Sequence, residues 1–249
     1  VGGQAVDKLN RDWALRPLRK AATAPFENID QGDGETLLLW RLDERRNGAI
    51  RIAGAGDAVP EIIGGIASPA SIAETGRFAG GRTNAGITAD PDNSALDFGA
   101  SSFTLEFWLR TDPVFATFTL AGRDGPLGES KDFGISLLPS GGLRAWLYDE
   151  AGLEWSAESE APVDDSVWRL VTMSVDREAG WLYLLIDDEV VAASPCPDGF
   201  KGVRNQGQPF RAGHLDAFGP ARFTAPAEFP GVLDEMRVLN YARKPGETK

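Results

Sequence analysis

Aromatic residues near the middle of the chain are the side chains best suited to hold a ligand. Trp146, Tyr148 and Trp155 fall in two short apolar segments that flank residues 150–152, and we expect these segments to pair as a hairpin. On one face of that hairpin the three rings would form a platform, with Arg144 beside them. Rings flanked by polar groups stack on the faces of sugars. The alternative is that the same rings fill a hydrophobic core, and the residues alone leave both interpretations open.

Residue types used in hydrolytic and metal-dependent catalysis are sparse. The chain has one histidine, His214, and one cysteine, Cys196, so it lacks a multi-histidine or cysteine-rich zinc ligand set. It also lacks the Gly-x-Ser-x-Gly motif of acyl-transfer enzymes. The acidic clusters at residues 149–150 and 158–160 fall at turns or strand ends, where we interpret them as solvated loop charges. These observations favour binding over catalysis.

The elements that must position these residues are β-strands. In residues 103–110, alternate side chains take opposite faces, with apolar Phe103, Leu105, Phe107 and Leu109 on one of them. Further strands are predicted at residues 37–42, 117–121, 133–138, 143–149, 153–159, 167–176, 181–187, 189–193, 210–213 and 231–239. About a dozen strands separated by turn residues predict an all-β, two-sheet antiparallel sandwich.

Two groups of aromatic residues are assigned to the interior of this sandwich. Residues 181–186 are apolar on both faces of their strand, which predicts a strand covered on both sides. Trp108 and Trp168 are expected in the core.

The first part of the chain does not follow the strand pattern. Val6, Leu9 and Trp13 are spaced as on a short helix, and Pro, Gly and Asp residues follow them. We therefore expect a helix and linker over residues 1–34 and one β-sandwich domain over residues 35–249.

Composition limits the classes of partner. The chain has 37 Asp and Glu residues against 25 Lys and Arg, a formal net charge of −12. A field of that sign repels phosphate backbones and anionic lipid, so we expect no nucleic-acid partner. No apolar run reaches the length of about 18 residues that spans a bilayer, so we expect no membrane insertion. A single cysteine allows no intrachain disulfide, which exported bacterial domains also commonly lack.

Five segments, in order along the chain, resemble strands of the concanavalin A-like, laminin G-like domains. Residues 96–109 (LDFGASSFTLEFWL) are similar to the "sFTleFWv" strand of that family, and residues 168–176 (WRLVTMSVD) to its "W..va.t.D" strand. Residues 178–188 (EAGWLYLLIDD) resemble its "g.l.LYiDG" hairpin, with Asp188 where glycine is usual. Residues 229–242 (FPGVLDEMRVLNYA) resemble the closing strand, and residues 37–44 (LLLWRLDE) the opening one.

The resemblance implies a jelly-roll sandwich, a fold that carries lectins, adhesion modules, glycosidases and lyases alike. It also implies a structural calcium ion between the opening and closing strands, for which Asp43 and Asp234 occupy the matching positions. Alternatively, Asp234 satisfies a buried turn through hydrogen bonds without a metal.

Enzymes of this fold carry patterns that the chain lacks. The Glu-x-Asp-x-x-Glu strand of laminarinase-type enzymes is absent, and so is the Gln-x-His strand of alginate lyases. His214 is therefore expected to be structural or at the surface. The sequence predicts a non-catalytic recognition or adhesion module that binds glycan or protein, with neighbouring domains, in a secreted, periplasmic or cell-surface protein. A carbohydrate-active enzyme on the same fold, or a structural spacer, are the alternatives.

Overall fold

The computed structural model describes residues 36–40, 42, 49–50, 65–67, 72–77, 80–83, 87–89, 94–124, 131–215 and 229–245. The helix and linker predicted for residues 1–34 lie outside these residues, as does Asp43.

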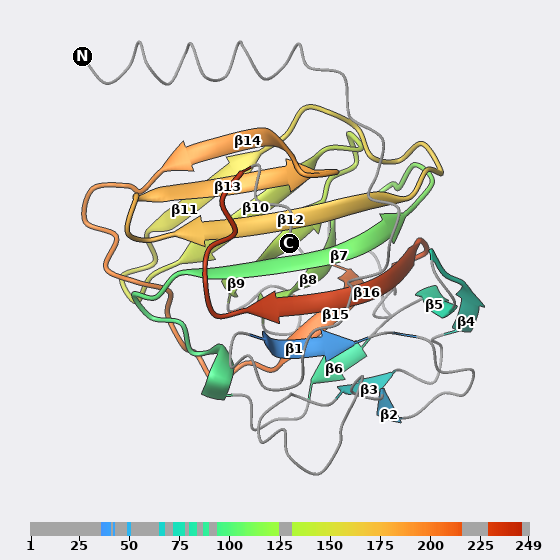
Figure 1. The fold of residues 1–249 in the computed structure, drawn as a ribbon, viewed down its shortest axis with the longest axis horizontal. Coiled ribbons are helices and arrows are strands. Elements are labelled where there is room, and N and C mark those ends of the chain that lie inside the picture. Colours follow the sequence, from blue (N-terminus) through green and yellow to red (C-terminus); the bar gives the residue numbers. More distant parts are fainter. Residues whose placement is uncertain are drawn as a thin grey trace.

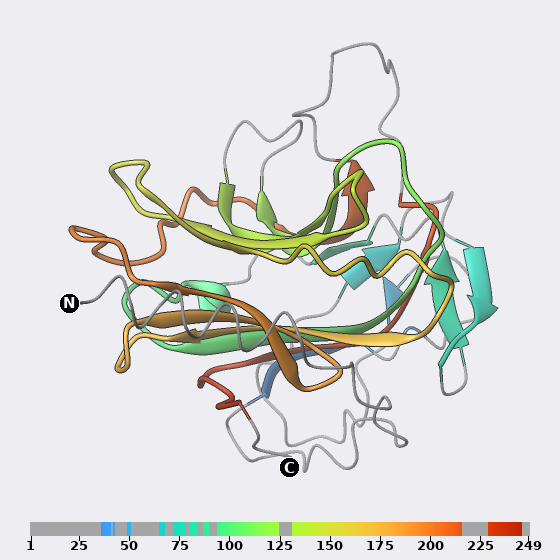
Figure 2. The ribbon, with the colours of Figure 1, turned by 90° about the horizontal axis from the view of Figure 1, so that it is seen from above.

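The described strands form two antiparallel sheets stacked face to face (Figures 1 and 2). The front sheet has the order β14 (Glu189–Pro195), β13 (Trp181–Ile186), β12 (Arg169–Asp176), β7 (Phe103–Arg110), β16 (Val232–Leu239), β5 (Gly80–Thr83) and β4 (Ile72–Thr75), and β1 (Thr36–Trp40) also pairs with β16. The back sheet has the order β11 (Glu154–Glu158), β10 (Leu143–Tyr148), β9 (Lys131–Leu137), β8 (Phe118–Asp124), β15 (Phe210–Leu215), β6 (Ile87–Ala89), β3 (Gly65–Ala67) and β2 (Ala49–Ile50). The predicted all-β sandwich is confirmed.

The opening and closing strands lie side by side. β1 pairs antiparallel with β16, with Trp40 opposite Met236 and Leu39 opposite Arg237. A single 3₁₀ turn, η1 (Ser94–Leu96), precedes β7. None of the helical segments described is long and apolar enough to cross a membrane.

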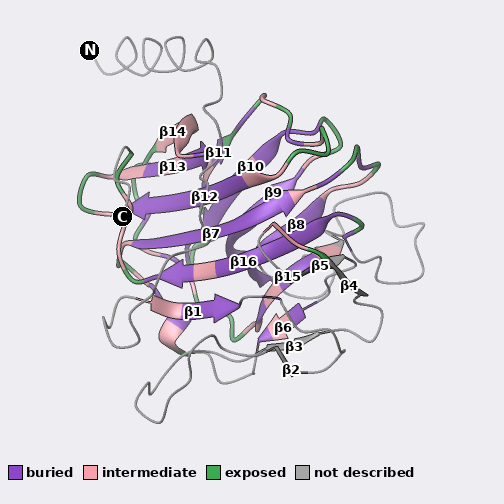
Figure 3. Cartoon of the chain, turned by 45° about the vertical axis from the view of Figure 1, so that its right-hand side comes forward, coloured by how far each residue is buried: buried purple, intermediate pink, exposed green. Residues whose placement is uncertain are grey.

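The core lies between the sheets and is rich in aromatic rings. Phe98 and Phe103 stack at 3.9 Å between ring centroids, and both meet Phe133 of the back sheet edge to face. Trp40 packs on Phe210 in the same way at 5.6 Å. The central strands are buried along most of their length (Figure 3). This layer of rings removes a large apolar area from water, which is the main term that stabilises the sandwich.

The two tryptophans predicted in the core differ in their burial. Trp108 is buried, but it alternates with Phe107 and Leu109 and therefore lies on the outer face of the front sheet, where the Arg77 guanidinium lies 5.2 Å from its ring. Trp168 is only half-buried and lies against Arg110. The predicted core position is confirmed for Trp108 as regards its burial and is wrong for Trp168.

Candidate functional site

The predicted hairpin forms between β10 and β11, and its turn is held by an acid. Asp149 is buried, and its Oδ1 accepts hydrogen bonds from the main-chain N–H groups of Ala151 and Leu153, at 2.9 and 2.8 Å. Gly152 adopts a φ of +79°, a left-handed conformation that costs glycine little. Asp149 is thus a turn residue, and the prediction that it is a solvated loop charge is wrong.

The hairpin register separates the four residues predicted to share a face. Residues directly opposite each other in an antiparallel pair project to the same side. Tyr148 lies opposite Glu154, whereas Trp155 lies opposite Leu147, a core residue. Arg144, Trp146 and Tyr148 therefore lie on the outer face of the back sheet. Trp155 points into the core, where it is fully buried, and does not belong to the predicted platform.

The exposed part of the outer face carries a bonded acid–base cluster. Arg144 donates to one oxygen of Glu154, and the Tyr148 hydroxyl donates to the other at 2.7 Å. Burial raises the pKa of Glu154, but hydrogen bonds from Ser156 and Tyr148 and the Arg144 charge outweigh it and leave the pKa below its ordinary value. All three side chains of the cluster remain partly exposed. We call Arg144, Tyr148 and Glu154 the hairpin cluster.

Trp146 lies next to the hairpin cluster on the outer face of the back sheet. Its ring lies over Gly134 of β9, so close that a Cβ on Gly134 would sit 2.7 Å from the indole. The Lys131 ammonium lies 4.9 Å from the ring centroid, and the indole N–H donates to the Ser136 hydroxyl at 2.9 Å. Only 2% of Trp146 is exposed, so its face is not open to a ligand. Tyr148 lies beside it, with 6.2 Å between ring centroids.

A polar cluster of β8 and β15 lies on the same outer face. The Thr119 hydroxyl donates to Asp124 at 3.1 Å although five positions separate them, and Asp124 also bonds His214 of β15 at 2.8 Å. Two irregularities interrupt the pairing of β8 with β9 between Thr119 and Asp124. Gly122 lies between them, where a Cβ would come within 2.5 Å of the Phe133 carbonyl oxygen. His214 is thus part of a polar cluster with Asp124 and Thr119, and its structural role stays a prediction.

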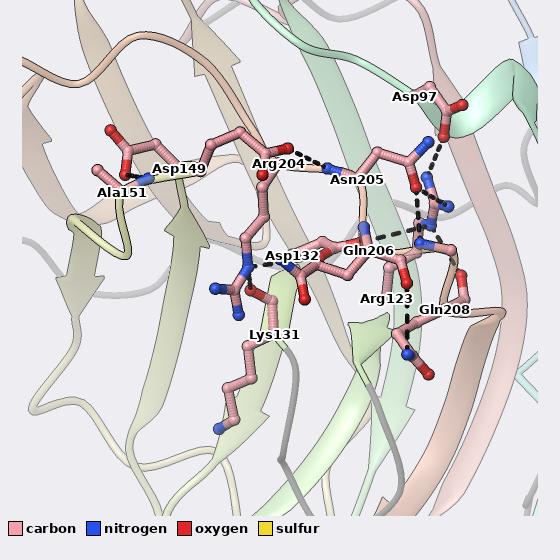
Figure 4. A network of polar contacts seen from close by, with 12 residues as sticks. Asp97, Arg123, Lys131, Asp132, Asp149, Ala151, Arg204, Asn205, Gln206 and Gln208 are labelled. Atoms are coloured by element: carbon pink, nitrogen blue, oxygen red, sulfur yellow. Dashed lines mark hydrogen bonds and ion pairs between the residues drawn. The ribbon is translucent and has the colours of Figure 1, made fainter.

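A second polar network anchors the loop after β14 to the first residues of β9 (Figure 4). The buried Arg123 guanidinium donates to Asn205 and to the main-chain oxygen of Leu96, at 3.0 and 3.1 Å. Asp132 lies 3.5 Å from the Arg204 guanidinium. Burial raises the pKa of Asp132 and outweighs the hydrogen bond and the two arginines that lower it. Beside this network is an open depression of about 510 Å³, lined by residues 99–100, 149–151 and 201–203.

Asp234, the described member of the predicted calcium pair, lies fully buried in β16. Its Oδ2 accepts a hydrogen bond of 2.7 Å from the main-chain N–H of Arg77. Over the described residues, no group of three or more His, Cys, Asp or Glu side chains is arranged to hold a metal ion. Because Asp43 lies outside those residues, calcium binding stays a prediction.

Comparison with known families agrees with this architecture. The family model of the concanavalin A-like lectin/glucanases superfamily matches residues 80–248. The chain belongs to this superfamily. Among curated protein sequences, none matches the chain significantly.

Solved structures share the superfamily sandwich at low sequence identity. The binding domain of Paraclostridial Mosquitocidal Protein 1 superposes with a TM-score of 0.63 at 14% identity, covering 85% of this chain and 50% of that one. The botulinum neurotoxin serotype D binding domain gives 0.60 at 10% identity, again with 85% and 50% covered. The present chain therefore spans about half the length of these toxin binding domains.

A third structure matches over nearly its whole length. It is domain 4 of AbnA, an extracellular arabinanase from Geobacillus stearothermophilus, in complex with arabinotriose. It superposes with a TM-score of 0.58 at 15% identity, covering 85% of this chain and 95% of that one. At such identities the likeness shows the concanavalin A-like fold alone, and the function must be argued from the site.

Proposed function

We propose that this protein is a non-catalytic recognition module that binds a glycan on the outer face of its back sheet, through the hairpin cluster. The observation that carries the proposal is the Arg144–Glu154–Tyr148 arrangement. It presents an aromatic ring and two fixed hydrogen-bonding groups at a partly exposed position.

The cluster suits a sugar because it is already ordered. Both oxygens of Glu154 are engaged by neighbours, so Arg144 and Tyr148 hold fixed orientations before a ligand arrives. Preorganised groups lose less conformational entropy on binding. Free donor positions on the Arg144 guanidinium can bond sugar hydroxyls while the Tyr148 ring packs on the apolar face of the sugar.

The proposed setting is a larger exported protein, with the ligand-binding domain beside other domains. Two neighbours support this setting by their names, since one is a domain of an extracellular arabinanase and another a toxin binding domain. The first of these was solved with arabinotriose, which supports a glycan as the ligand class.

The test is a glycan array followed by affinity electrophoresis of the purified protein with each polysaccharide that scores. Tyr148→Ala and Arg144→Ala are each expected to weaken binding about tenfold or more, the size of one lost hydrogen bond to a charged group or one lost ring contact. Phe115→Ala is the matched control, because Phe115 is 69% exposed and lies outside the cluster.

Two outcomes would contradict the proposal. Unchanged binding by both cluster variants would show that the hairpin cluster is not the binding site. Release of reducing sugar ends from any bound polysaccharide would show that the protein is an enzyme.

A further inference from the structure

A pair of aromatic rings lies on the opposite side of the molecule from the hairpin cluster. Trp181 and Tyr183 alternate along β13 with Leu182 and Leu184, which lie in the core. The two rings therefore share the outer face of the front sheet. Their centroids are 6.2 Å apart and their planes differ by 22°. Both side chains are partly exposed, so the prediction that this strand is covered on both faces is wrong.

The polar tips of both rings are free within the part of the chain that the structure describes. Neither the Trp181 indole N–H nor the Tyr183 hydroxyl has a hydrogen-bond partner there. The buried tryptophans of the back sheet behave differently, since Trp146 donates to Ser136 and Trp155 to Ser194. Buried indoles usually find partners inside the protein, whereas an exposed one can donate to a ligand.

The C-terminal segment runs along one side of the pair. Residues 241–244 cross the outer face of the front sheet over β7 and β12 (Figures 1 and 2). Ser174, which lies opposite Tyr183 in the β12–β13 register, donates to the Arg243 main-chain oxygen at 2.7 Å. The Arg243 guanidinium bonds Asp188 at 2.8 Å. These two hydrogen bonds hold the C-terminal segment in place beside the two rings.

We propose that Trp181 and Tyr183 form a second glycan-binding site, specific for neutral sugars, that makes the domain bivalent. Near-parallel rings with free hydrogen-bonding tips match a ligand that presents apolar ring faces and peripheral hydroxyls, which is the chemistry of a saccharide. The site uses none of the residues of the hairpin cluster, so its own binding is independent of the function proposed for that cluster, whereas the bivalency rests on that proposed function.

Charge selects neutral over acidic sugars at this position. Asp176 lies opposite Trp181 in the strand register, and its carboxylate is close enough to Tyr183 to act on it. Burial, with a smaller contribution from this carboxylate, raises the pKa of the Tyr183 hydroxyl. The same negative charge repels the carboxylate or sulfate of an acidic sugar.

A protein partner fits the surface less well. Stable protein interfaces bury about 800 Å² on each partner and centre on apolar anchors. The pair offers two partly exposed rings, and the exposed large apolar side chains in the described chain, Phe115, Leu153 and Val167, lie in loops away from β13.

The experiment follows the indole N–H resonance of Trp181, assigned by its loss in Trp181→Phe, while neutral and acidic oligosaccharides are titrated. Arabino-, xylo- and cello-oligosaccharides serve as neutral probes and oligogalacturonate as the acidic one. We expect a neutral probe to shift this resonance in the Tyr148→Ala variant, in which the hairpin cluster is removed. Isothermal titration calorimetry with the same probe gives the affinity of the variants that lack this resonance. Trp181→Ala and Tyr183→Ala, each combined with Tyr148→Ala, should weaken the residual binding about tenfold or more.

The outcomes separate the two sites. Binding that survives Tyr148→Ala but is lost in the double variant Tyr148→Ala/Trp181→Ala supports the second site. No shift of the Trp181 resonance with any neutral probe overturns it, whatever the hairpin cluster does. Equal or tighter binding of oligogalacturonate overturns the stated specificity, and a shift produced only by a protein would assign the rings to a protein interface instead.

Discussion

The Trp155 indole N–H donates a hydrogen bond of 3.1 Å to the main-chain oxygen of Ser194, and this bond joins the two sheets of the sandwich at one edge. Trp155 lies on β11 of the back sheet and Ser194 on β14 of the front sheet. Phe200 packs edge to face on the same indole at 5.5 Å, and the Arg177 guanidinium lies 5.5 Å from its ring. The Trp155 side chain therefore covers the hydrophobic core at the edge of the sandwich where β11 and β14 lie.

We expect Trp155→Ala to lower the free energy of unfolding by about 3–5 kcal/mol, because it leaves a cavity and an unbonded carbonyl. The measurement is urea denaturation followed by circular dichroism. Leu153→Ala, at a neighbouring side chain that is 37% exposed, is the control and should change stability by no more than about 0.5 kcal/mol. A small effect of Trp155→Ala would mean that the indole is not a core residue.

Glu106 anchors the C-terminal segment on the front sheet. This fully buried carboxylate bonds Arg237 on β16 and Arg243 beyond it. Glu106→Gln removes the buried counter-charge of Arg237 and one of the two carboxylates that bond Arg243, so we expect a loss of about 3–5 kcal/mol in the free energy of unfolding. The C-terminal segment should also become sensitive to limited trypsin cleavage after Arg243.

Asp165→Asn is the matched control for Glu106→Gln. Asp165 also bonds an arginine, Arg169, but its side chain is 44% exposed, and such surface pairs contribute less than about 1 kcal/mol. Equal effects of the two substitutions would show that the buried pair does not hold the segment.

Gly134 is required by the Trp146 ring. A Cβ at this position would lie 2.7 Å from the indole and 2.8 Å from the Ala121 carbonyl oxygen. We expect Gly134→Ala to destabilise the protein by about 1–3 kcal/mol, the usual range for overpacking. Ser136→Ala, which only removes the acceptor of the indole N–H, should cost about 0.5–1.5 kcal/mol. The measurement is the melting temperature of each variant compared with that of the parent protein. A Gly134→Ala protein as stable as the parent would contradict this packing of the Trp146 ring.

The long strands can be predicted from the local alternation of apolar and polar residues. The face on which a side chain lies depends, in addition, on the register in which two strands pair. The long strands, such as residues 103–110, were predicted because each carries its own period-two pattern. The short strands β2 to β6 were missed, since two to four residues contain too little pattern to read. Trp155 was assigned to the wrong face because a one-residue difference in hairpin register reverses every side chain.

The remaining contacts could not be predicted from the sequence, because they join residues that are far apart along the chain. Glu106 and Arg237 are separated by 131 positions, and no local pattern pairs them. Glu154, in contrast, could have been found, because it lies directly opposite Tyr148 once the hairpin turn is fixed. The i, i+2 spacing of Trp181 and Tyr183 indicates that the two rings share one face of β13. The apolar character of residues 181–186 pointed instead to a strand covered on both faces, and this obscured the pair.

Tyr148 provides a titration test of the hairpin cluster. Burial, followed by the hydrogen bond and the charge of Glu154, raises its pKa from 10.0 to about 12. The folded protein thus holds the phenolic proton more tightly than the unfolded chain. The stability that Tyr148 contributes is complete below pH 10 and is lost as the pH rises through 12.

We expect Glu154→Gln to move the Tyr148 pKa down toward 10.0, because the charge that opposes ionisation is removed while burial remains. Ultraviolet absorbance of the phenolate gives the titration, and Tyr148→Phe assigns it. Glu158→Gln, an exposed neighbour on the same strand, should leave the curve unchanged. An unmoved Tyr148 pKa in Glu154→Gln would mean that the cluster is not bonded as described.

Calcium binding at Asp234 can be tested directly by stability. An ion that binds only the folded chain raises the free energy of unfolding by mass action. We therefore expect the melting temperature in millimolar calcium to exceed that in EDTA by several degrees, and Asp234→Asn to abolish the difference. The asparagine retains an oxygen that can accept the 2.7 Å hydrogen bond from the Arg77 N–H, so the variant separates metal binding from turn stabilisation. Identical melting temperatures of the parent protein in calcium and EDTA would leave Asp234 with the hydrogen-bonding role alone.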